Sequence, residues 1–364
     1  MSKKENIITI VLFFGFILGF LIAFIVKPDI KFSDNENRYL EQQPKASFAD
    51  VKSGEFMEGW EDYVSDQFPL RDSFMMVGAR CKNYIGIKDI NGVFLGADGH
   101  LLSVMDKNAI NHERVVKNID IINSFLNKVD ADAAFMLVPD AVLMYENKLP
   151  KGVDIKWERK LLMDIRAGIS DATLIVPENE MLKTDEQLYY YTDHHWTGYG
   201  AQAAYKEYCN QLGITEKEAA LSVVSEEFYG SLYSKVLFCE KADEIVLDES
   251  KKDIKIVKDG ENGYLYDYDI LNKKDKYLLF QGGNYGLVEI EGTGEGTLLV
   301  LKDSFANSFV PFLTENYEKI VMVDLRYYMG SVTALCEKEG VTNVLVLYSL
   351  SNFVSDENMI KLGL

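Results

Sequence analysis

The chain has 364 residues, which is enough for one large domain or two smaller ones with substantial cores. Its content of 48% hydrophobic and 12% aromatic residues excludes a disordered chain. The formal net charge of −19 argues against nucleic acid or anionic lipid as a partner, and favours a neutral or weakly charged polymer over a polyanion. Solubility alone is an equally simple explanation of the acidic balance.

The first residues predict a membrane segment. Residues 7–26 are uncharged and almost all apolar, which is long enough to cross a bilayer as one helix. Lys3 and Lys4 precede this stretch and favour a cytoplasmic N-terminus with the body on the extracytoplasmic side of the cell membrane. A cleaved signal peptide is the competing interpretation, but residues 25–28 offer no small-x-small cleavage site. We therefore expect an uncleaved, single-pass anchor over residues 1–27.

The next part of the chain predicts a tether and then an α/β pattern. Residues 28 to about 55 are polar and irregular, residues 56–88 have a helical pattern, and residues 90–102 form a hairpin around the turn signal Asp98-Gly99. Short apolar runs then alternate with helical patterns, at residues 113–126 (helix), 134–138 (strand), 157–168 (helix), 173–176 (strand) and 199–212 (helix). Such alternation is typical of a parallel sheet with crossover helices.

A β-rich excursion interrupts this pattern between about residues 218 and 292, where short alternating runs lie among many Asp, Glu, Lys, Gly and Tyr residues. The regular pattern then resumes, with strands at 297–302, 319–323 and 343–348 and helices from Ser304 and near 329–338. We therefore predict an anchor (1–27), a tether with a helical and hairpin region that packs on the main domain (28–110), and an α/β domain with a β-rich insertion (111–364).

The four cysteines, Cys81, Cys209, Cys239 and Cys336, are scattered and form no C-x-x-C pair. Two disulfides are possible outside the cytoplasm, and buried free thiols are as plausible because each cysteine has apolar neighbours in the sequence. We expect no metal site and no cofactor, since His100 and His112 have no Cys or His partner at zinc spacing.

The tetrapeptide Asp193-His194-His195-Trp196 is the strongest chemical signal in the chain, because it holds two of the four histidines. Histidine is the usual general base near neutral pH, and an aspartate beside it can fix its tautomer. In an extended segment residues i and i+2 point to the same side, so Asp193 and His195 would face one site and His194 would point away. A histidine pair with a purely structural role is the alternative.

The second component is Ser304, which follows the apolar run Thr297–Lys302. A serine between a buried strand and a helix is in the position where α/β hydrolytic enzymes hold their nucleophile, beside unpaired N–H groups of the first helical turn. A helix cap at Asp303 or Ser304 without chemistry is the alternative. Together with Asp-x-His in the same chain, Ser304 becomes a candidate nucleophile.

These motifs carry a family resemblance over nearly all of the chain after the anchor. The chain resembles the DHHW family of bacterial membrane-anchored proteins, which is related to the alginate O-acetylation proteins with an SGNH-hydrolase-like fold. The matching segments are Asn35–Arg38, Asp66–Arg71, Leu95–Gly99, Asp193–Trp196, Gly282–Asn284, Lys302–Phe305 and Asp324–Tyr328. The resemblance implies a triad of Ser304 as nucleophile, His195 as base and Asp193 as orienting acid.

The order of these motifs predicts a circular permutation of the SGNH arrangement, in which the serine follows the first strand and the Asp and His follow the last. Strands 297–302, 319–323 and 343–348 would be the first three of the sheet, and strands 134–138 and 173–176 the last two. Under this mapping Asn352 falls near the oxyanion-hole asparagine. Asp-x-His in place of Asp-x-x-His, and the absence of Gly-x-Asn-Asp near Asn352, are departures from the SGNH pattern.

Three further residues are weaker candidates. Asn352 either donates a hydrogen bond in an oxyanion hole or caps a loop. Arg326 either orients the oxygens of an acyl group or sugar, or pairs with Asp324 or Asp303. Trp196 forms a floor for sugar stacking or packs against the following helix.

The resemblance implies an O-acetyltransferase acting on a cell-surface or secreted polysaccharide beside a multi-spanning membrane acyltransferase. An acetylesterase on the same polymer, or a non-catalytic polysaccharide-binding or assembly module, is the alternative.

Overall fold

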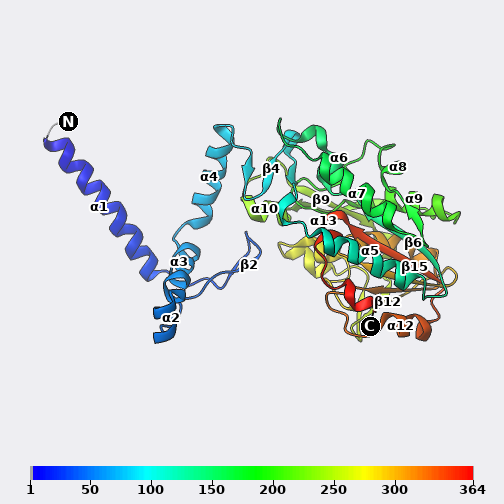
Figure 1. Ribbon diagram of the computed structural model, residues 1–364. Helices are drawn as coiled ribbons and strands as arrows, with labels where there is room; N and C mark the ends of the chain where they lie inside the picture. The colour runs from blue at the N-terminus through cyan, green and yellow to red at the C-terminus, as the bar shows by residue number, and fades with distance from the viewer. Residues whose placement is uncertain (1–2, 364) are drawn as a thin grey trace. The chain divides into compact units, whose positions relative to one another are not determined.

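A computed structural model of the protein describes residues 3–363 (Figure 1). The chain divides into two compact units. One consists of the stretch that ends at Ile87 together with Ser234–Phe238, and the other of Lys88–Tyr233 and Cys239–Leu364. The domain limits that the sequence predicts at residues 27 and 110 remain predictions.

The first unit begins with helix α1 (Lys3–Val26), drawn in blue in Figure 1. Among residues 3–363 it contains the one stretch, Lys4–Val26, that is long and apolar enough to cross a membrane, with a mean hydropathy of 2.9. Its side chains are exposed almost throughout. A helix of this length and apolarity fits a membrane anchor and also a signal sequence.

The predicted helical region after the tether consists of three helices, α2 (Phe48–Ser53), α3 (Glu55–Gln67) and α4 (Arg71–Tyr84). The chain breaks between α3 and α4 at Phe68–Leu70, because Pro69 has no N–H to donate and Leu70 adopts a left-handed conformation, with φ 60°. The short hairpin of β1 (Phe32–Ser33) and β2 (Arg38–Tyr39) lies in the tether, which is therefore more ordered than the sequence predicts.

Ion pairs explain two of the segments that carry the family resemblance. Arg38 makes a bidentate contact with Asp66, at 2.5 and 2.8 Å, and also pairs with Glu36. Arg71 pairs with Glu36 as well. Both carboxylates are largely buried, so the pairing compensates their desolvation and joins the β1–β2 hairpin to the start of α4.

The hairpin predicted at residues 90–102 is confirmed as the last two strands of a small antiparallel sheet. Its strands are β3 (Asp89–Ile90), β4 (Val93–Leu95) and β5 (Leu101–Ser103). The turn between β4 and β5 contains Asp98 and Gly99, both with positive φ, which is the conformation that this pair of residues favours.

The centre of the second unit is an eight-stranded sheet in the order β11-β10-β12-β14-β13-β15-β6-β7. The five strands β14 (Lys319–Val323), β13 (Thr297–Lys302), β15 (Asn343–Ser349), β6 (Asp132–Val138) and β7 (Thr173–Ile175) are parallel. Their apolar runs are continuous because both faces of a parallel sheet are covered, and each run matches a strand predicted from the sequence.

The strand order confirms the predicted circular permutation. If β13 is taken as the first strand, β14, β15, β6 and β7 become the second to fifth, and their spatial order is 2-1-3-4-5. This is the order of doubly wound α/β folds, in which ligands bind outside the carboxyl ends of the strands where the connections change direction. The point of change here lies between β13 and β15, which places Ser304 at the expected edge.

The β-rich excursion has two parts. Strands β8 (Leu221–Phe228) and β9 (Asp243–Asp248) form a separate antiparallel pair, with helix α10 (Ser231–Val236) between them. Strands β10 (Lys255–Lys258), β11 (Glu261–Tyr264) and β12 (Leu287–Glu291) extend the main sheet with antiparallel pairings beyond β14. The 3₁₀ turns η5 (Tyr268–Asn272) and η6 (Lys276–Leu279) connect β11 to β12.

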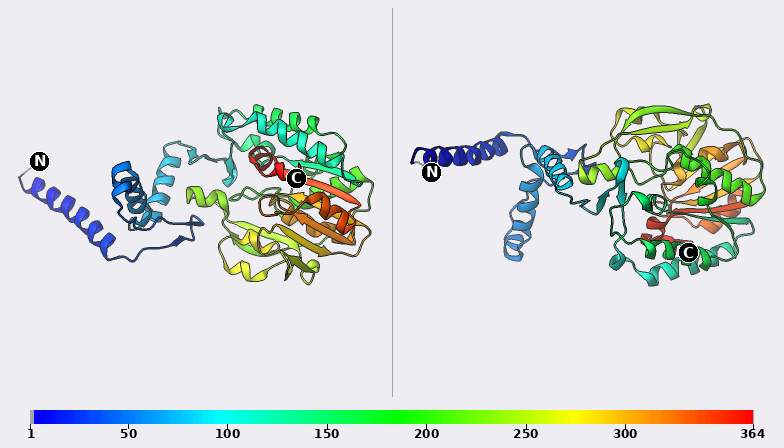
Figure 2. Two further views of the ribbon diagram at one scale, coloured as in Figure 1. Left: turned by 60° about the horizontal axis from the view of Figure 1, so that its bottom comes forward. Right: turned by 90° about the horizontal axis from the view of Figure 1, so that it is seen from above.

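Two groups of helices cover the faces of the sheet (Figure 2). Helices α5 (His112–Leu126), α7 (Lys156–Gly168) and α13 (Leu350–Ser355) form one group, and α5 contacts the other two. Helix α9 (Gly198–Leu212) packs against α11 (Ala306–Phe309) and the 3₁₀ turn η7 (Val310–Glu315) in the other. The remaining crossover helix, α12 (Val332–Glu339), leads into β15.

The helix predicted from Ser304 is shorter than the sequence indicates. Only Ala306–Phe309 is α-helical, and the chain continues as 3₁₀ turns over Val310–Glu315. Pro311 accounts for the change, because it has no N–H for the i→i−4 hydrogen bond that would continue an α-helix. The four cysteines all lie in the described residues and none is paired, so no disulfide contributes to this fold.

Candidate active site

The Asp193–Trp196 segment is bent and not extended as the sequence predicts. Asp193 Oδ1 accepts a hydrogen bond from the backbone N–H of His195 at 3.0 Å, which turns the chain sharply over two residues. Tyr189 and Trp196 then pair across the loop as an isolated β-bridge. The turn, and not strand alternation, brings the carboxylate of Asp193 and the ring of His195 to the same side.

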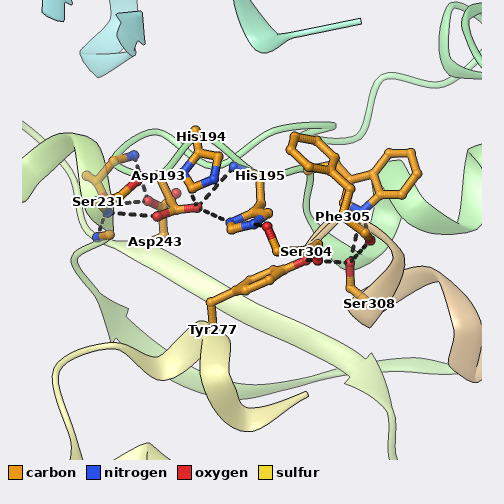
Figure 3. Close-up of polar contacts among 12 residues, drawn as sticks. Asp193, His194, His195, Ser231, Asp243, Tyr277, Ser304, Phe305 and Ser308 are labelled. Carbon is orange, nitrogen blue, oxygen red and sulfur yellow. Dashed lines mark hydrogen bonds and ion pairs between the residues drawn. The ribbon is translucent and has the colours of Figure 1, made fainter. Parts of the chain in front are cut away.

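Asp193, His195 and Ser304 form a continuous chain of hydrogen bonds (Figure 3). His195 Nδ1 lies 2.6 Å from Asp193 Oδ1, and His195 Nε2 lies 2.7 Å from Ser304 Oγ. The three residues are buried, with exposed fractions of 3%, 5% and 8%. The carboxylate can hold the Nδ1 proton, so Nε2 is left to accept the serine proton, which is the arrangement of a nucleophile, a base and an orienting acid.

Further donors stabilise the charged form of Asp193. Its Oδ2 accepts a hydrogen bond from the backbone N–H of Ser231 at 2.7 Å. Burial opposes ionisation, but His194, His195 and these hydrogen bonds outweigh it and hold the pKa of the carboxyl well below its usual range. Gly230 permits this approach, since a Cβ atom there would lie 2.3 Å from the Cβ of Asp193.

A second buried aspartate supports the loop before the histidines. Asp243, on β9, accepts hydrogen bonds from the backbone N–H groups of Tyr191 and Thr192 at 2.6 and 2.7 Å, and from Thr192 Oγ1 at 2.6 Å. Burial raises the pKa of Asp243 to about 6, although these bonds favour its charged form. Because β9 belongs to the excursion, the excursion helps to shape the loop that carries His195.

His194 does not point away from the site. Its ring centroid lies 3.9 Å from that of His195, and its Nδ1 lies 2.6 Å from Ser231 Oγ. About 41% of its side chain is exposed, whereas His195 is buried. The bend at Asp193 explains the difference from the prediction, because two neighbouring residues in a tight turn need not project to opposite faces.

Ser304 follows β13 directly, and Asp303 fixes the backbone around it. The two carboxylate oxygens of Asp303 accept hydrogen bonds from the N–H of Phe305 and from the N–H and Oγ of Ser349, at 2.7–2.9 Å. Asn352 Nδ2 donates to the same carboxylate at 2.8 Å. Asp303 therefore joins the nucleophile turn to the end of β15, which is a structural role next to the candidate nucleophile.

Arg326 belongs to a buried charge network at the end of β14. Its guanidinium makes two hydrogen bonds to Asp324, at 2.6 and 2.8 Å. Asp324 also pairs with the fully buried Lys302 at 3.6 Å, and burial lowers the pKa of Lys302 to about 8. Lys302 Nζ also donates to Asn307 Oδ1 at 2.7 Å. The pairing with Asp324 that the sequence offered as the structural explanation of Arg326 is thus present.

A cavity of about 370 Å³ lies at the carboxyl ends of β13, β14 and β15 and is lined in part by Asp303, Arg326, Tyr348 and Asn352. Arg326 and Asn352 both line this cavity, whereas Ser304 is not among its lining residues, so a site shared by all three remains a prediction. The hydroxyl of Tyr348 is buried and has no hydrogen-bond partner among the described residues.

Trp196 is fully buried and offers no surface for sugar stacking. Its indole N–H donates to the carbonyl of Phe305 at 3.0 Å and to Ser308 Oγ at 2.9 Å. Its ring packs against Phe305 and Phe309. Trp196 therefore joins the Asp193–Trp196 loop to the turn that follows Ser304. This agrees with the alternative that Trp196 packs inside the protein.

Sequence reasoning missed Tyr277, Ser231 and Asp243, which all come from the excursion. Tyr277 stacks on the ring of His195, with centroids 3.7 Å apart, and is buried (Figure 3). Each of the three contacts the histidine loop across at least 37 residues of sequence, and no local motif marks any of them. A homologue alignment would be the natural source of such a signal.

Among residues 3–363, Asp193, His194 and His195 form the one group whose side chains have the composition and spacing of metal ligands. Both ring nitrogens of His195 are used in hydrogen bonds to Asp193 and Ser304. His194 Nδ1 is likewise hydrogen-bonded to Ser231. Three of the four histidine ring nitrogens in this group are thus engaged in hydrogen bonds to side chains.

Two family models match the chain. The model described as DHHW protein matches residues 174–323, and the model described as SGNH hydrolase-like domain, acetyltransferase AlgX, matches residues 94–228. Together they include Asp193, His195 and Ser304. These two regions of the chain are therefore similar to the DHHW and SGNH hydrolase-like models, in line with the motifs. No curated protein matches the chain.

Solved structures agree with this fold. A DHHW family protein from Eubacterium siraeum is 23% identical, with a TM-score of 0.63, over 76% of this chain and 96% of its own. Bacillus cereus PatB1, solved with a sulfonyl adduct, is 22% identical with a TM-score of 0.59, over 74% of this chain and 97% of its own. At this identity the likeness concerns the fold.

Proposed function

We propose that the protein is a serine-dependent acyltransferase that moves an acetyl group onto a hydroxyl of an extracytoplasmic polysaccharide. The observation that carries the proposal is the hydrogen-bonded chain Asp193–His195–Ser304, with contacts of 2.6 and 2.7 Å. The match to an SGNH hydrolase-like acetyltransferase model supports acetyl transfer as the reaction class.

In the first half of the reaction, Ser304 Oγ attacks the carbonyl carbon of an acetyl ester while His195 Nε2 takes the serine proton. The tetrahedral intermediate collapses, the ester C–O bond breaks, and His195 returns the proton to the departing oxygen. Asp193 stabilises the imidazolium through Nδ1. The product of this half is an acetyl group on Ser304.

In the second half, a sugar hydroxyl attacks the acetyl-serine while His195 takes the hydroxyl proton. The bond to Ser304 Oγ breaks, and His195 returns the proton to that oxygen. Water in place of the sugar gives the acetylesterase reaction, so occupancy of the acceptor site decides between transfer and hydrolysis. Arg326 and Asn352, which line the cavity at the strand ends, are candidates for contacts with the acyl or sugar oxygens.

The placement of the enzyme is part of the proposal. Helix α1 would anchor the protein in the cell membrane, with the second unit on the extracytoplasmic side. A membrane-bound acyltransferase that exports acetyl groups would supply the donor. The net charge of −19 fits a neutral or weakly charged acceptor polymer better than a polyanion.

The test uses the full-length protein in detergent. The wild type should hydrolyse p-nitrophenyl acetate, and an aryl sulfonyl fluoride should modify Ser304, because PatB1 of the same fold forms a sulfonyl adduct. Ser304→Ala should lower kcat by several orders of magnitude, since the triad members act as a unit. Peptide mass spectrometry would locate the adduct.

Ser250→Ala is the matched control, because Ser250 is exposed in the same unit and contacts none of the triad residues. It should hydrolyse and react as the wild type does. Turnover that survives in Ser304→Ala, or a sulfonyl group on another serine, would refute the proposal. Acetate release that does not respond to any added glycan would favour the esterase reaction over transfer.

A further inference from the structure

Tyr277 holds an unusual position beside the proposed base. It lies in the 3₁₀ turn η6 of the β-rich excursion, far from the Asp193–Trp196 loop in sequence. Its ring lies face to face with the ring of His195, with centroids 3.7 Å apart and an interplanar angle of 8° (Figure 3). The side chain is 3% exposed, so solvent cannot replace this contact.

The hydroxyl of the same tyrosine reaches the nucleophile turn. Tyr277 Oη donates to the backbone carbonyl of Ser304 at 2.9 Å and lies 3.1 Å from Ser308 Oγ. One rigid side chain therefore contacts the face of the proposed base and the backbone of the proposed nucleophile.

The two hydrogen bonds of His195 leave one motion of its ring weakly restrained. Contacts at Nδ1 and Nε2 fix rotation of the imidazole in its own plane, but tilting about the line between the two nitrogens keeps both bonds within reach. A ring stacked at 3.7 Å blocks that tilt on one face. Proton transfer is sensitive to such displacements, and about 1 Å of misplacement can cost a factor of roughly 10² in rate.

We propose that Tyr277 is a positioning residue that holds His195 and the Ser304 turn in the geometry needed for acyl transfer. This inference rests on the proposed function. Tyr277 neither gives nor takes a proton in the proposed reaction and acts through the two residues that it holds. The excursion is therefore part of the catalytic unit and not a separable insertion, because it supplies Tyr277 as well as the contacts of Ser231 and Asp243.

The packing around Tyr277 shows how the excursion holds it in place. Its ring contacts Tyr190 edge-on at 6.3 Å and Phe280 at 5.3 Å. Phe280 in turn forms a β-bridge with Tyr266, and their rings lie 5.9 Å apart. Tyr266 is thus a second buried tyrosine of the excursion, in the same cluster, with no recorded contact to His195 or Ser304.

The test compares substitutions at these two tyrosines in the full-length protein. Tyr277→Leu removes the stacked ring and should lower kcat for p-nitrophenyl acetate about 10²-fold with little change in KM. The rate of sulfonyl fluoride labelling should fall by a similar factor. Tyr277→Phe keeps the ring and loses only the hydroxyl, so it should recover most of the lost rate.

Tyr266→Leu is the matched control for a general loss of packing. Its exposed fraction is 2%, against 3% for Tyr277, so the two leucine variants should be destabilised to a similar degree. Only Tyr277→Leu should lose activity, while Tyr266→Leu should stay within about twofold of the wild type. Equal loss of kcat in both variants would refute the positioning role.

A spectroscopic measurement separates this inference from the proposed function. The chain has four histidines, so selective ¹³C labelling of histidine gives a spectrum that single substitutions can assign. The ring current of a stacked tyrosine shifts the His195 carbon-bound protons, and Tyr277→Leu should remove that shift while Tyr266→Leu retains it. A wild type with neither turnover nor labelling would refute the proposed function. Normal wild-type turnover that Tyr277→Leu leaves unchanged would refute only the role of Tyr277.

Discussion

Two adjacent histidines differ in what their ring nitrogens contact. Both ring nitrogens of His195 are hydrogen-bonded within the triad, to Asp193 and to Ser304. His194 Nδ1 is bonded to the hydroxyl of Ser231, and its side chain is partly exposed. Identical chemistry at neighbouring positions therefore has different consequences, and only His195 is placed to take a proton from the serine.

Substitution of each histidine tests this assignment. His195→Ala should lower kcat for p-nitrophenyl acetate by about 10³-fold or more, because removal of one triad member disables the others. His194→Ala should lower it less than about tenfold, since it removes a contact to Ser231 and no proton acceptor of the triad. Steady-state measurements of kcat for both variants show which histidine the reaction needs. The reverse order of losses would mean that His194 is the base.

The candidate triad could be predicted because its three residues lie in two short sequence motifs. Asp193 and His195 are two residues apart, and Ser304 follows an apolar strand directly. Tyr277, Ser231 and Asp243 could not be found in this way, since the contacts that matter are tertiary and lie in an irregular segment. The choice between sugar stacking and packing for Trp196 stayed open for a related reason, because a single sequence does not show which side of a loop faces the core.

At the scale of elements, the parallel strands were the most predictable part. Each is a continuous apolar run because both faces are buried, and β13 and β14 match the predicted limits. The excursion was predicted only as β-rich, since its strands are short and joined by 3₁₀ turns with little periodicity. The helix after Ser304 was overestimated because the apolar residues Val310, Phe312 and Leu313 indicated a helix although Pro311 interrupts it.

Asp140 connects two elements and makes stability depend on pH. It lies at the end of β6, where Ser351 of α13 donates to it through its N–H at 3.1 Å and its Oγ at 2.9 Å. Burial and the nearby Asp303 raise the pKa of Asp140 to about 7 in spite of these bonds. The folded protein then binds more protons than the unfolded chain between about pH 4 and 7. The stability that the protonated group contributes is lost as pH rises through that range.

Asp140→Asn should flatten this dependence. We expect the loss of unfolding free energy between pH 5 and pH 8 to be smaller in the variant than in the wild type by about 1–3 kcal/mol, at roughly 1.4 kcal/mol per pKa unit. Denaturant titrations of the full-length protein at both pH values measure it. Asp164→Asn is the control, because Asp164 is exposed on α7 and should leave the slope unchanged. Parallel slopes for all three proteins would contradict the prediction.

At the scale of the whole molecule, the proposed extracytoplasmic location of the second unit can be tested on the natural chain. Cys81 lies in α4 and is exposed, whereas Cys209 and Cys336 are buried. If the chain after α1 is outside the cell membrane, a membrane-impermeant maleimide should label the protein in intact cells. Cys81→Ser should remove most of that label.

Lysed cells provide the comparison for this experiment. Labelling of Cys81 that appears only after lysis would place the body in the cytoplasm and contradict the proposed location. Release of a shortened protein into the medium would show instead that the apolar segment is cleaved as a signal sequence. The two outcomes are separated by the mass of the labelled chain.

The position of β15 has a consequence for the order in which the protein matures. This strand lies between β13 and β6, so it separates the strand that carries Ser304 from the strands that precede the histidine loop. Synthesis proceeds from the N-terminus, and β15 is the last strand of the chain to emerge. His195 and Asp193 are therefore made more than 100 residues before Ser304, and the sheet that unites them closes only when Asn343–Ser349 has been translated. A chain that has not yet reached β15 thus holds Asp193, His195 and Ser304 without the sheet that brings them together.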